Sequence, residues 1–161
     1  MVACVTITFV TINDMTKLEL ENFLPYRLNR LSSAVSKEFR SVYGRHHDLT
    51  IPEWRVLATL GQFEEMSAKA IGLHSSMHKT KVSRAVKALE DRRWLKRRES
   101  DQDRREEILA LTALGRRTYS DIVPRAVAFE QHILTSLGPD ADKLLAIIGQ
   151  LERLFKESAD D

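Results

Sequence analysis

The chain has little of what disulfide-stabilised or membrane-spanning proteins require. Its 161 residues include a single cysteine, Cys4, so no internal disulfide can form. We therefore expect a reducing, cytoplasmic location. No stretch approaches the roughly 20 uncharged apolar residues that cross a bilayer, so no membrane partner is expected. The apolar start, residues 1–14, lacks the basic residues and the cleavage site of a signal peptide.

Motifs of catalysis are also scarce. The chain has six glycines and five histidines, with no phosphate-binding glycine loop and no nucleophile elbow. His74 and His78 have the spacing of a metal pair, but a turn is expected between them and no Cys, Asp or Glu is close in sequence. The sequence therefore predicts a protein that is not an enzyme and that has no metal site or cofactor.

Charge is unevenly distributed although the formal net charge is only +2. The segment from Met77 to Arg105 has eleven basic and five acidic residues, which leaves fourteen basic and eighteen acidic residues for the remainder. A basic segment on a mildly acidic body indicates a local site for a polyanion. On charge alone, a solvated basic face is an equal alternative.

The periodicity of apolar residues predicts a mainly α fold with a small β-hairpin wing. The predicted helices cover residues 24–44, 50–60, 67–74, 77–93, 112–134 and a last segment after Gly138-Pro139, and the predicted strands cover 95–98 and 107–111. Thr50 with Glu53 forms a capping box, and Ser67 and Thr112 are further N-caps. Pro124 is expected to kink or interrupt its helix.

We expect three parts in this order. Residues 1–14, with a period-2 pattern that suits a short strand, form an N-terminal extension. Residues 49–112 form a winged helix-turn-helix DNA-binding domain. Residues 15–48 and 113–161 form a helical dimerisation region, because their long apolar stripes would otherwise form a large exposed patch. The alternative is that these stripes fold back on the monomer's own core.

The strongest constellation begins at Ser67, where a short helix, a tight turn and a second helix follow the helix-turn-helix plan. The second helix exposes polar residues opposite its apolar face, and its first turns would enter the major groove of DNA. Helix N-termini and serine hydroxyls can hold phosphates. The candidate DNA-binding residues here are Ser75, Ser76, His78, Lys79, Thr80, Lys81, Ser83, Arg84 and Lys87. An ordinary surface helix with solvated charges is the alternative.

The charged hairpin adds further candidates. Arg97 and Arg98 lie on its first strand, and Arg104 and Arg105 lie at its tip beside Asp103. An arginine at such a tip can enter the narrow minor groove, and a neighbouring aspartate can hold a second arginine. Adjacent hairpin residues point to opposite sides, so both tip arginines cannot face the DNA. A solvated turn with weak ion pairs is the alternative.

Over residues 20–157 the sequence resembles the MarR family of bacterial winged helix-turn-helix transcriptional regulators. The matching pieces are the runs 50–57, 81–84 with 89–90, and 101–105 followed by 109–115. The last run, an Asp-x-Arg wing leading into Leu-x-Leu-Thr-x-x-Gly, is the most specific. The chain departs from the family at Arg93, where a glycine is usual between the recognition helix and the wing.

The resemblance implies a homodimer joined by its N- and C-terminal helices. Two winged helices would bind a pseudo-palindromic operator in double-stranded DNA, usually in repression that a small molecule relieves. By match to the motif, Asp103 and Arg105 are the bracing pair and Arg104 is the exposed tip.

A small-molecule effector, such as an aromatic acid or its thioester, would bind between the dimer helices and the DNA-binding lobe. The candidate ligand-binding residues are Tyr26, Arg27, Phe39, Tyr43, His46, Trp54 and Arg55. Aromatic residues at helical spacing are equally expected in a plain core. The sequence is also compatible with a winged helix that binds only proteins, and with a metal- or oxidant-responsive regulator, although Cys4 lies in the N-terminal extension.

Overall fold

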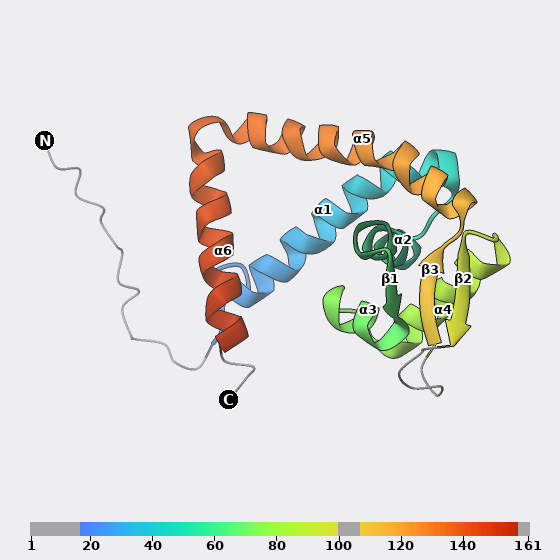
Figure 1. The fold of residues 1–161 in the computed structure, drawn as a ribbon. Helices are drawn as coiled ribbons and strands as arrows, with labels where there is room; N and C mark the ends of the chain where they lie inside the picture. Colours follow the sequence, from blue (N-terminus) through green and yellow to red (C-terminus); the bar gives the residue numbers. More distant parts are fainter. Residues whose placement is uncertain (1–16, 100–106, 158–161) are drawn as a thin grey trace, which may run out of the picture. The chain divides into compact units, whose positions relative to one another are not determined.

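The computed structural model contains helices and one small sheet (Figure 1), and it describes residues 17–99 and 107–157 apart from the side chains of Arg45, Lys156 and Glu157. The elements are α1 (Leu24–His47), α2 (Ile51–Phe63), β1 (Glu65–Ser67), α3 (Ala68–His74), α4 (Lys79–Asp91), β2 (Leu95–Glu99), β3 (Glu107–Leu111), α5 (Ala113–Leu137), the 3-10 turn η1 (Gly138–Asp140) and α6 (Ala141–Glu157). This mainly helical architecture with a β-hairpin confirms the predicted fold class. None of the described helices is long and apolar enough to span a membrane.

The predicted helix starts are confirmed by their side-chain caps. The Thr50 hydroxyl accepts a hydrogen bond from the Glu53 amide, and the Glu53 carboxylate accepts one from the Thr50 amide at 2.9 Å. Ser67 caps α3 and Thr112 caps α5 in the same way, through the amides of Ala70 and Gly115. Each cap satisfies a backbone donor that the helix leaves unpaired, and such a cap contributes about 1 kcal/mol.

Several boundaries differ from the sequence prediction. α1 continues through Gly44 to His47, and Pro124 lies inside α5 without interrupting it. α4 begins at Lys79 with His78 as its N-cap, so Met77 belongs to the preceding turn. Tertiary packing explains why local signals failed here, since Tyr43 and Ile122 beside these positions are buried.

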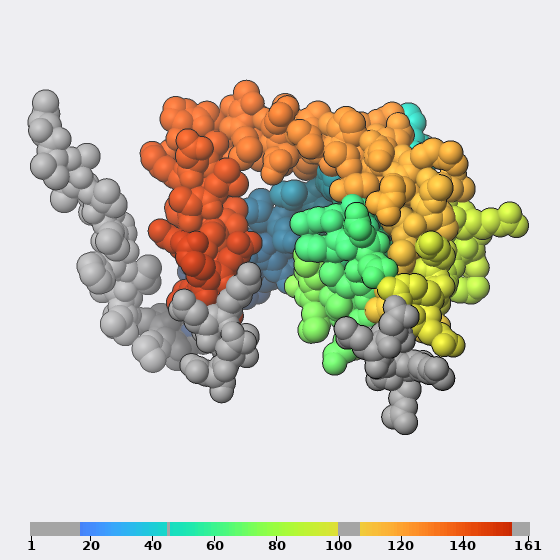
Figure 2. Space-filling model, viewed as in Figure 1, coloured from blue at the N-terminus to red at the C-terminus, as the bar shows by residue number. Residues whose placement is uncertain are grey.

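The sheet is antiparallel in the order β1-β3-β2. β1 was not predicted, because its three residues become a strand only by pairing with β3, in the register Glu65 to Ala110 and Ser67 to Ile108. Together with α2, α3 and α4 the sheet encloses the main core, which includes Val56, Leu60 and Leu89 at 0% exposure. In Figures 1 and 2 these elements run from the green of α2 through the yellow of β2 to the yellow-orange of β3.

The Leu-x-Leu-Thr-x-x-Gly run joins the wing to α5. Thr112 donates its hydroxyl to the Arg93 carbonyl at 2.8 Å, and its amide donates to the Trp94 carbonyl at 3.0 Å. A Cβ at Gly115 would lie 2.0 Å from that same Trp94 oxygen, so only glycine allows this approach. The start of α5 is thereby fixed against the turn between α4 and β2.

The terminal helices present exposed apolar residues. Residues up to Ser36 form a unit of their own, in which Leu24 and Leu31 of α1 are 54% and 59% exposed. Within the second unit, Ile147, Leu154 and Phe155 of α6 are 52%, 55% and 65% exposed. Several apolar residues of the predicted stripes are therefore exposed, and their role in a dimer stays a prediction.

Candidate nucleic-acid interface

α4 is anchored on one side and open on the other. Val82, Val86 and Leu89 are at most 1% exposed and pack against α2 and α3. On the opposite side all of the predicted base- and phosphate-contacting residues of the helix are exposed, namely Lys79, Thr80, Lys81, Ser83, Arg84 and Lys87. The buried face fixes the orientation of the helix, so the polar face projects from a rigid support.

The turn before α4 is shaped by polar side chains that the sequence predicts as DNA contacts. The Ser75 hydroxyl donates to the Ile71 carbonyl, and Ser76 has a positive φ of 51°. His78 accepts a hydrogen bond from the Thr80 amide through Nδ1 at 3.4 Å, which leaves Nε2 to carry the proton. The His78 ring therefore caps α4 and can still donate outward from Nε2.

The cations on the open face of α4 are not equivalent. Lys87 forms an ion pair with Asp91 at 2.7 Å, and this hydrogen bond raises the pKa of the Lys87 amine. Among residues 17–99 and 107–157, Lys79, Lys81 and Arg84 have no ion-pair partner. The unpaired cations thus lie in the first two turns of the helix.

The two strand arginines are held by carboxylates. Arg97 of β2 bonds to Glu90 of α4, at 2.8 Å from Nη2, and also to Glu107 of β3. These hydrogen bonds raise the pKa of the Arg97 guanidinium. Arg98 bonds to Glu65 of β1 at 2.8 Å. In this arrangement both arginines fasten the wing to its neighbours. The predicted tip residues Asp103, Arg104 and Arg105 lie outside the described residues.

Arg93, the departure from the family's glycine, follows α4 with a φ of 61°. This is the left-handed conformation that glycine adopts most readily and that other residues adopt at a cost. Its amide donates to the Glu90 carbonyl at 2.8 Å, and the next amide, of Trp94, donates to Leu89 at 2.9 Å. The arginine therefore forms the expected helix stop despite its side chain.

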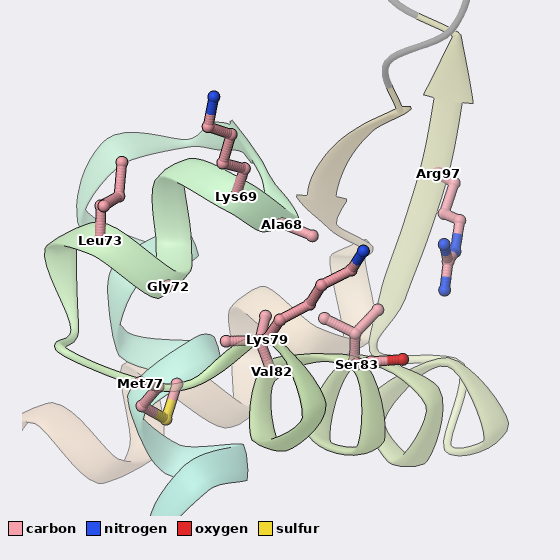
Figure 3. A pocket seen from close by; sticks show the side chains of 10 residues that line it. Ala68, Lys69, Gly72, Leu73, Met77, Lys79, Val82, Ser83 and Arg97 are labelled. Carbon is pink, nitrogen blue, oxygen red and sulfur yellow. The ribbon is translucent and has the colours of Figure 1, made fainter.

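A hollow of about 460 Å³ lies on the same side, between α3, α4 and β2. Figure 3 shows side chains from these elements around it. Its lining combines the apolar Met77, Val82 and Val86 with the cations Lys69, Lys79 and Arg97. Lys69 and Met77 were not predicted as part of this surface, because only the tertiary fold brings residues of α3, α4 and β2 around one hollow.

The predicted ligand residues are only partly brought together. Phe39, Tyr43 and Trp54 form one cluster with centroid distances of 5.3 to 5.5 Å, joined by Phe129 of α5 at 5.1 Å from Phe39. Tyr43 is 1% exposed, and burial raises its pKa against the opposing charges of Arg40 and Arg55. Such ring-on-ring packing is typical of a core.

The remaining ligand candidates have different surroundings. His46 is exposed and Arg55 is half-buried. In the unit that ends at Ser36, Tyr26 lies under the guanidinium of Arg30 at 5.8 Å, and Arg27 lines an open depression with Arg30. Within the described ranges, no group of three or more His, Cys, Asp or Glu side chains is placed to hold a metal ion.

Comparison with known proteins agrees with this geometry. Residues 47–106 match the model of the MarR family. The chain is 31% identical over 91 residues to the uncharacterized HTH-type transcriptional regulator YwoH of Bacillus subtilis (strain 168), a match that covers 56% of this chain and 65%, under two thirds, of that protein.

Solved structures extend the similarity over the whole fold. The MarR family transcriptional regulator SPO1453 from Silicibacter pomeroyi is 27% identical, with a TM-score of 0.72 over 86% of this chain and 99% of that one. The PcaV transcriptional regulator from Streptomyces coelicolor, solved in complex with its natural ligand, shares the fold at 22% identity, with a TM-score of 0.70 over 90% of this chain and 99% of that one.

Proposed function

The chain belongs to the MarR family, and from this premise we propose that it is a homodimeric transcriptional regulator that binds a pseudo-palindromic operator in double-stranded DNA. The observation that carries the proposal is the open face of α4, where Lys81 and Arg84 are exposed on a helix whose other side is buried. A helix held in this way can be inserted into the major groove, where lysine and arginine donate to guanine.

Phosphate contacts would position the helix. His78 and Ser76 lie at the N-terminal end of α4, where the helix dipole favours an anion and Nε2 of His78 is available as a donor. Lys79 at the first position of the helix adds a flexible cation. Arg104 would reach the minor groove from the wing tip, with Asp103 bracing Arg105.

The proposed dimer rests on the apolar faces of α1 and α6. Side chains such as Leu31, Ile147 and Phe155 are more than half exposed in the single chain. Contiguous apolar patches of this kind mark association surfaces. A second copy would cover them and would place two copies of α4 on one face of the duplex.

We further propose that the regulator is a repressor released by a small aromatic acid or its thioester. PcaV, which shares the fold, was solved with its natural ligand. The cluster of Phe39, Trp54 and Phe129 joins α1, α2 and α5, so a ligand inserted there would displace these helices relative to one another. Arg55 is half-buried on α2 and can pair with a carboxylate.

The test is binding of the full chain to duplex DNA from its own promoter region, followed by fluorescence anisotropy across a range of salt concentrations. We expect affinity that falls steeply with salt, and release on addition of the aromatic acid that most raises the melting temperature in a ligand screen. Lys37→Ala, an exposed charge change on α1, serves as the control for Lys81→Ala. Absence of salt-dependent duplex binding would leave the alternative of a winged helix that binds proteins.

A further inference from the structure

Arg92, at the C-terminal end of α4, contacts more elements than its place in the sequence indicates. We propose that Arg92 is a positioning residue, which fastens the C-terminal end of the recognition helix to the C-terminal end of α1 and so sets the orientation in which α4 is presented. The proposal rests on the proposed DNA-binding function. It assigns to Arg92 no contact with DNA.

The guanidinium forms two directed hydrogen bonds to the end of α1. Nη1 donates to the carbonyl of His47 at 2.7 Å, and Nη2 donates to the carbonyl of Asp48 at 2.8 Å. The buried Glu53 carboxylate lies 4.0 Å from the same Nη2. A planar fork with parallel donors is suited to this geometry, and the single ammonium of lysine is not.

These bonds satisfy groups that α1 leaves unpaired. The last carbonyls of a helix have no partner within it, and the helix dipole makes that end negative. His47 is the last residue of α1, and Asp48 leaves the helix with a positive φ of 48°. Arg92 thus caps a helix from 44 and 45 residues farther along the chain.

On its other side Arg92 determines where α4 stops and the wing begins. It is the C-cap of α4, with its amide donating to the Ala88 carbonyl at 3.2 Å. Its guanidinium lies over the Trp94 ring at 5.2 Å, and Trp94 directly precedes β2. A displacement of the guanidinium would therefore move both DNA-facing elements together.

α5 joins this contact through His47. The His47 Nε2 lies 3.0 Å from the Asp121 carboxylate of α5, and the His47 ring meets the edge of Trp94 at 6.3 Å. The ends of α1 and α4 are consequently tied to α5, one helical turn from the buried Thr118. A ligand or partner that shifts α1 against α5 would change the contact that holds α4.

The experiment compares Arg92→Ala and Arg92→Lys with Arg125→Ala, an exposed arginine of α5 that gives the same change of charge. Each full-length protein is titrated with a series of operators whose half-site spacing varies by single base pairs. For Arg92→Ala we expect about tenfold weaker binding to the native operator, the effect of losing roughly one charge-assisted hydrogen bond. We also expect a flatter dependence on spacing and an unchanged salt slope, with Arg92→Lys intermediate.

Two results would overturn the proposal. A salt slope reduced by about one unit with the spacing preference intact would make Arg92 a phosphate contact. Native affinity and spacing preference in a folded but less stable Arg92→Ala would make it a stabilising residue only.

A second measurement separates this proposal from the proposed function. In hydrogen exchange without DNA, Arg92→Ala is expected to accelerate exchange of the amides of Asp48, Arg93 and Trp94 together, while Arg125→Ala leaves them unchanged. If exchange of all three amides accelerates in a protein that binds no duplex, the role of Arg92 in holding α4 to α1 is kept and the proposed DNA-binding function is rejected. Acceleration at Arg93 and Trp94 alone would show that α1 is not held by Arg92, and would refute the proposal.

Discussion

Two regions of the molecule use the same apolar residue types with opposite results. One is the body, formed by α2, α3, α4 and the sheet, and the other consists of the terminal helices, α1 and α6. In the body, Leu57, Leu60 and Leu89 are 0% exposed, whereas Leu31 of α1 and Leu154 of α6 are 59% and 55% exposed. The body completes its core from one chain. The terminal helices have exposed apolar residues, which we propose that a second copy covers. The comparison shows that a leucine's role is set by what lies opposite it.

The largest effect is expected where, in the proposed dimer, the terminal helices would meet a second copy. Leu154→Asp and Ile147→Asp should abolish the dimer, because burying an unpaired carboxylate costs several kcal/mol. Sedimentation at micromolar concentration measures the outcome. Leu73→Asp is the matched control, since Leu73 is 75% exposed on the body and should leave the dimer intact. A wild-type protein that sediments as a folded monomer would show that the apolar residues of the terminal helices do not need a second copy.

Within the body, Leu89→Ala should lower the free energy of unfolding by about 2–5 kcal/mol, the cost of a cavity in a closed core. Leu73→Ala on the exposed side of α3 should change it by less than about 0.5 kcal/mol. Denaturant titration of both variants checks the difference. A small loss for Leu89→Ala would mean that the body's core is less complete than its burial indicates.

The open face of α4 should show graded losses in DNA binding. Arg84→Ala and Lys81→Ala are expected to cost about 1–3 kcal/mol each and to relax sequence preference. Lys87→Ala should weaken all duplexes alike and by less, because Lys87 already pairs with Asp91. Anisotropy titrations with operator and scrambled duplexes separate the two patterns. If both Lys81→Ala and Arg84→Ala left operator binding unchanged, α4 would not be the recognition helix.

A smaller effect is expected at the wing tip, where the direction of the change in operator binding distinguishes two explanations. Asp103→Ala should weaken operator binding by about 0.2–1 kcal/mol, because the proposed ion pair with Arg105 would be lost. Electrostatics alone expects tighter binding when an acid beside DNA is removed. Titration at fixed salt gives the sign, and tighter binding would reject the bracing role of Asp103 for Arg105.

The smallest effect concerns Tyr43 in the aromatic cluster. Burial raises the pKa of Tyr43 above its usual value of 10.0. The neutral phenol is favoured in the folded protein, so its contribution is intact below about pH 10 and is lost as the pH rises through the raised value. Unfolding measured from pH 9 to 11 should show a shallower decline for Tyr43→Phe. Equal slopes in the two proteins would indicate a phenol that is accessible in the folded state.

Local signals in the sequence predicted much of the fold. Thr50, Ser67 and Thr112 each act within three residues of themselves, and all three caps form as expected. β1 could not be predicted, because Met66 is a strand residue only opposite Leu109. Arg93 departs from the family's glycine and yet adopts the left-handed backbone that glycine adopts most readily.

The residue types of the candidate site could be predicted from the sequence, but the ion pairs and hydrogen bonds among them could not. The exposed cations of α4 follow from the helical period, since its apolar face had to be buried. The DNA contact of Arg97 stays a prediction, but its hydrogen bonds to Glu90 and Glu107, seven and ten residues away on neighbouring elements, were not foreseen. The hollow beside Lys79 and the fork of Arg92 likewise depend on residues that only the tertiary fold brings together.

Under the proposed function, the Glu90–Arg97–Glu107 cluster would also affect how the protein searches DNA for its operator. Two carboxylates surround one guanidinium, so the cluster carries a formal charge of −1 beside the cationic turns of α4. In the proposed function, this negative charge would weaken the general attraction to phosphates, so fewer counterions would be released on random sequence. Residence at non-operator sites would then be shorter, with no change in the proposed contacts to the operator.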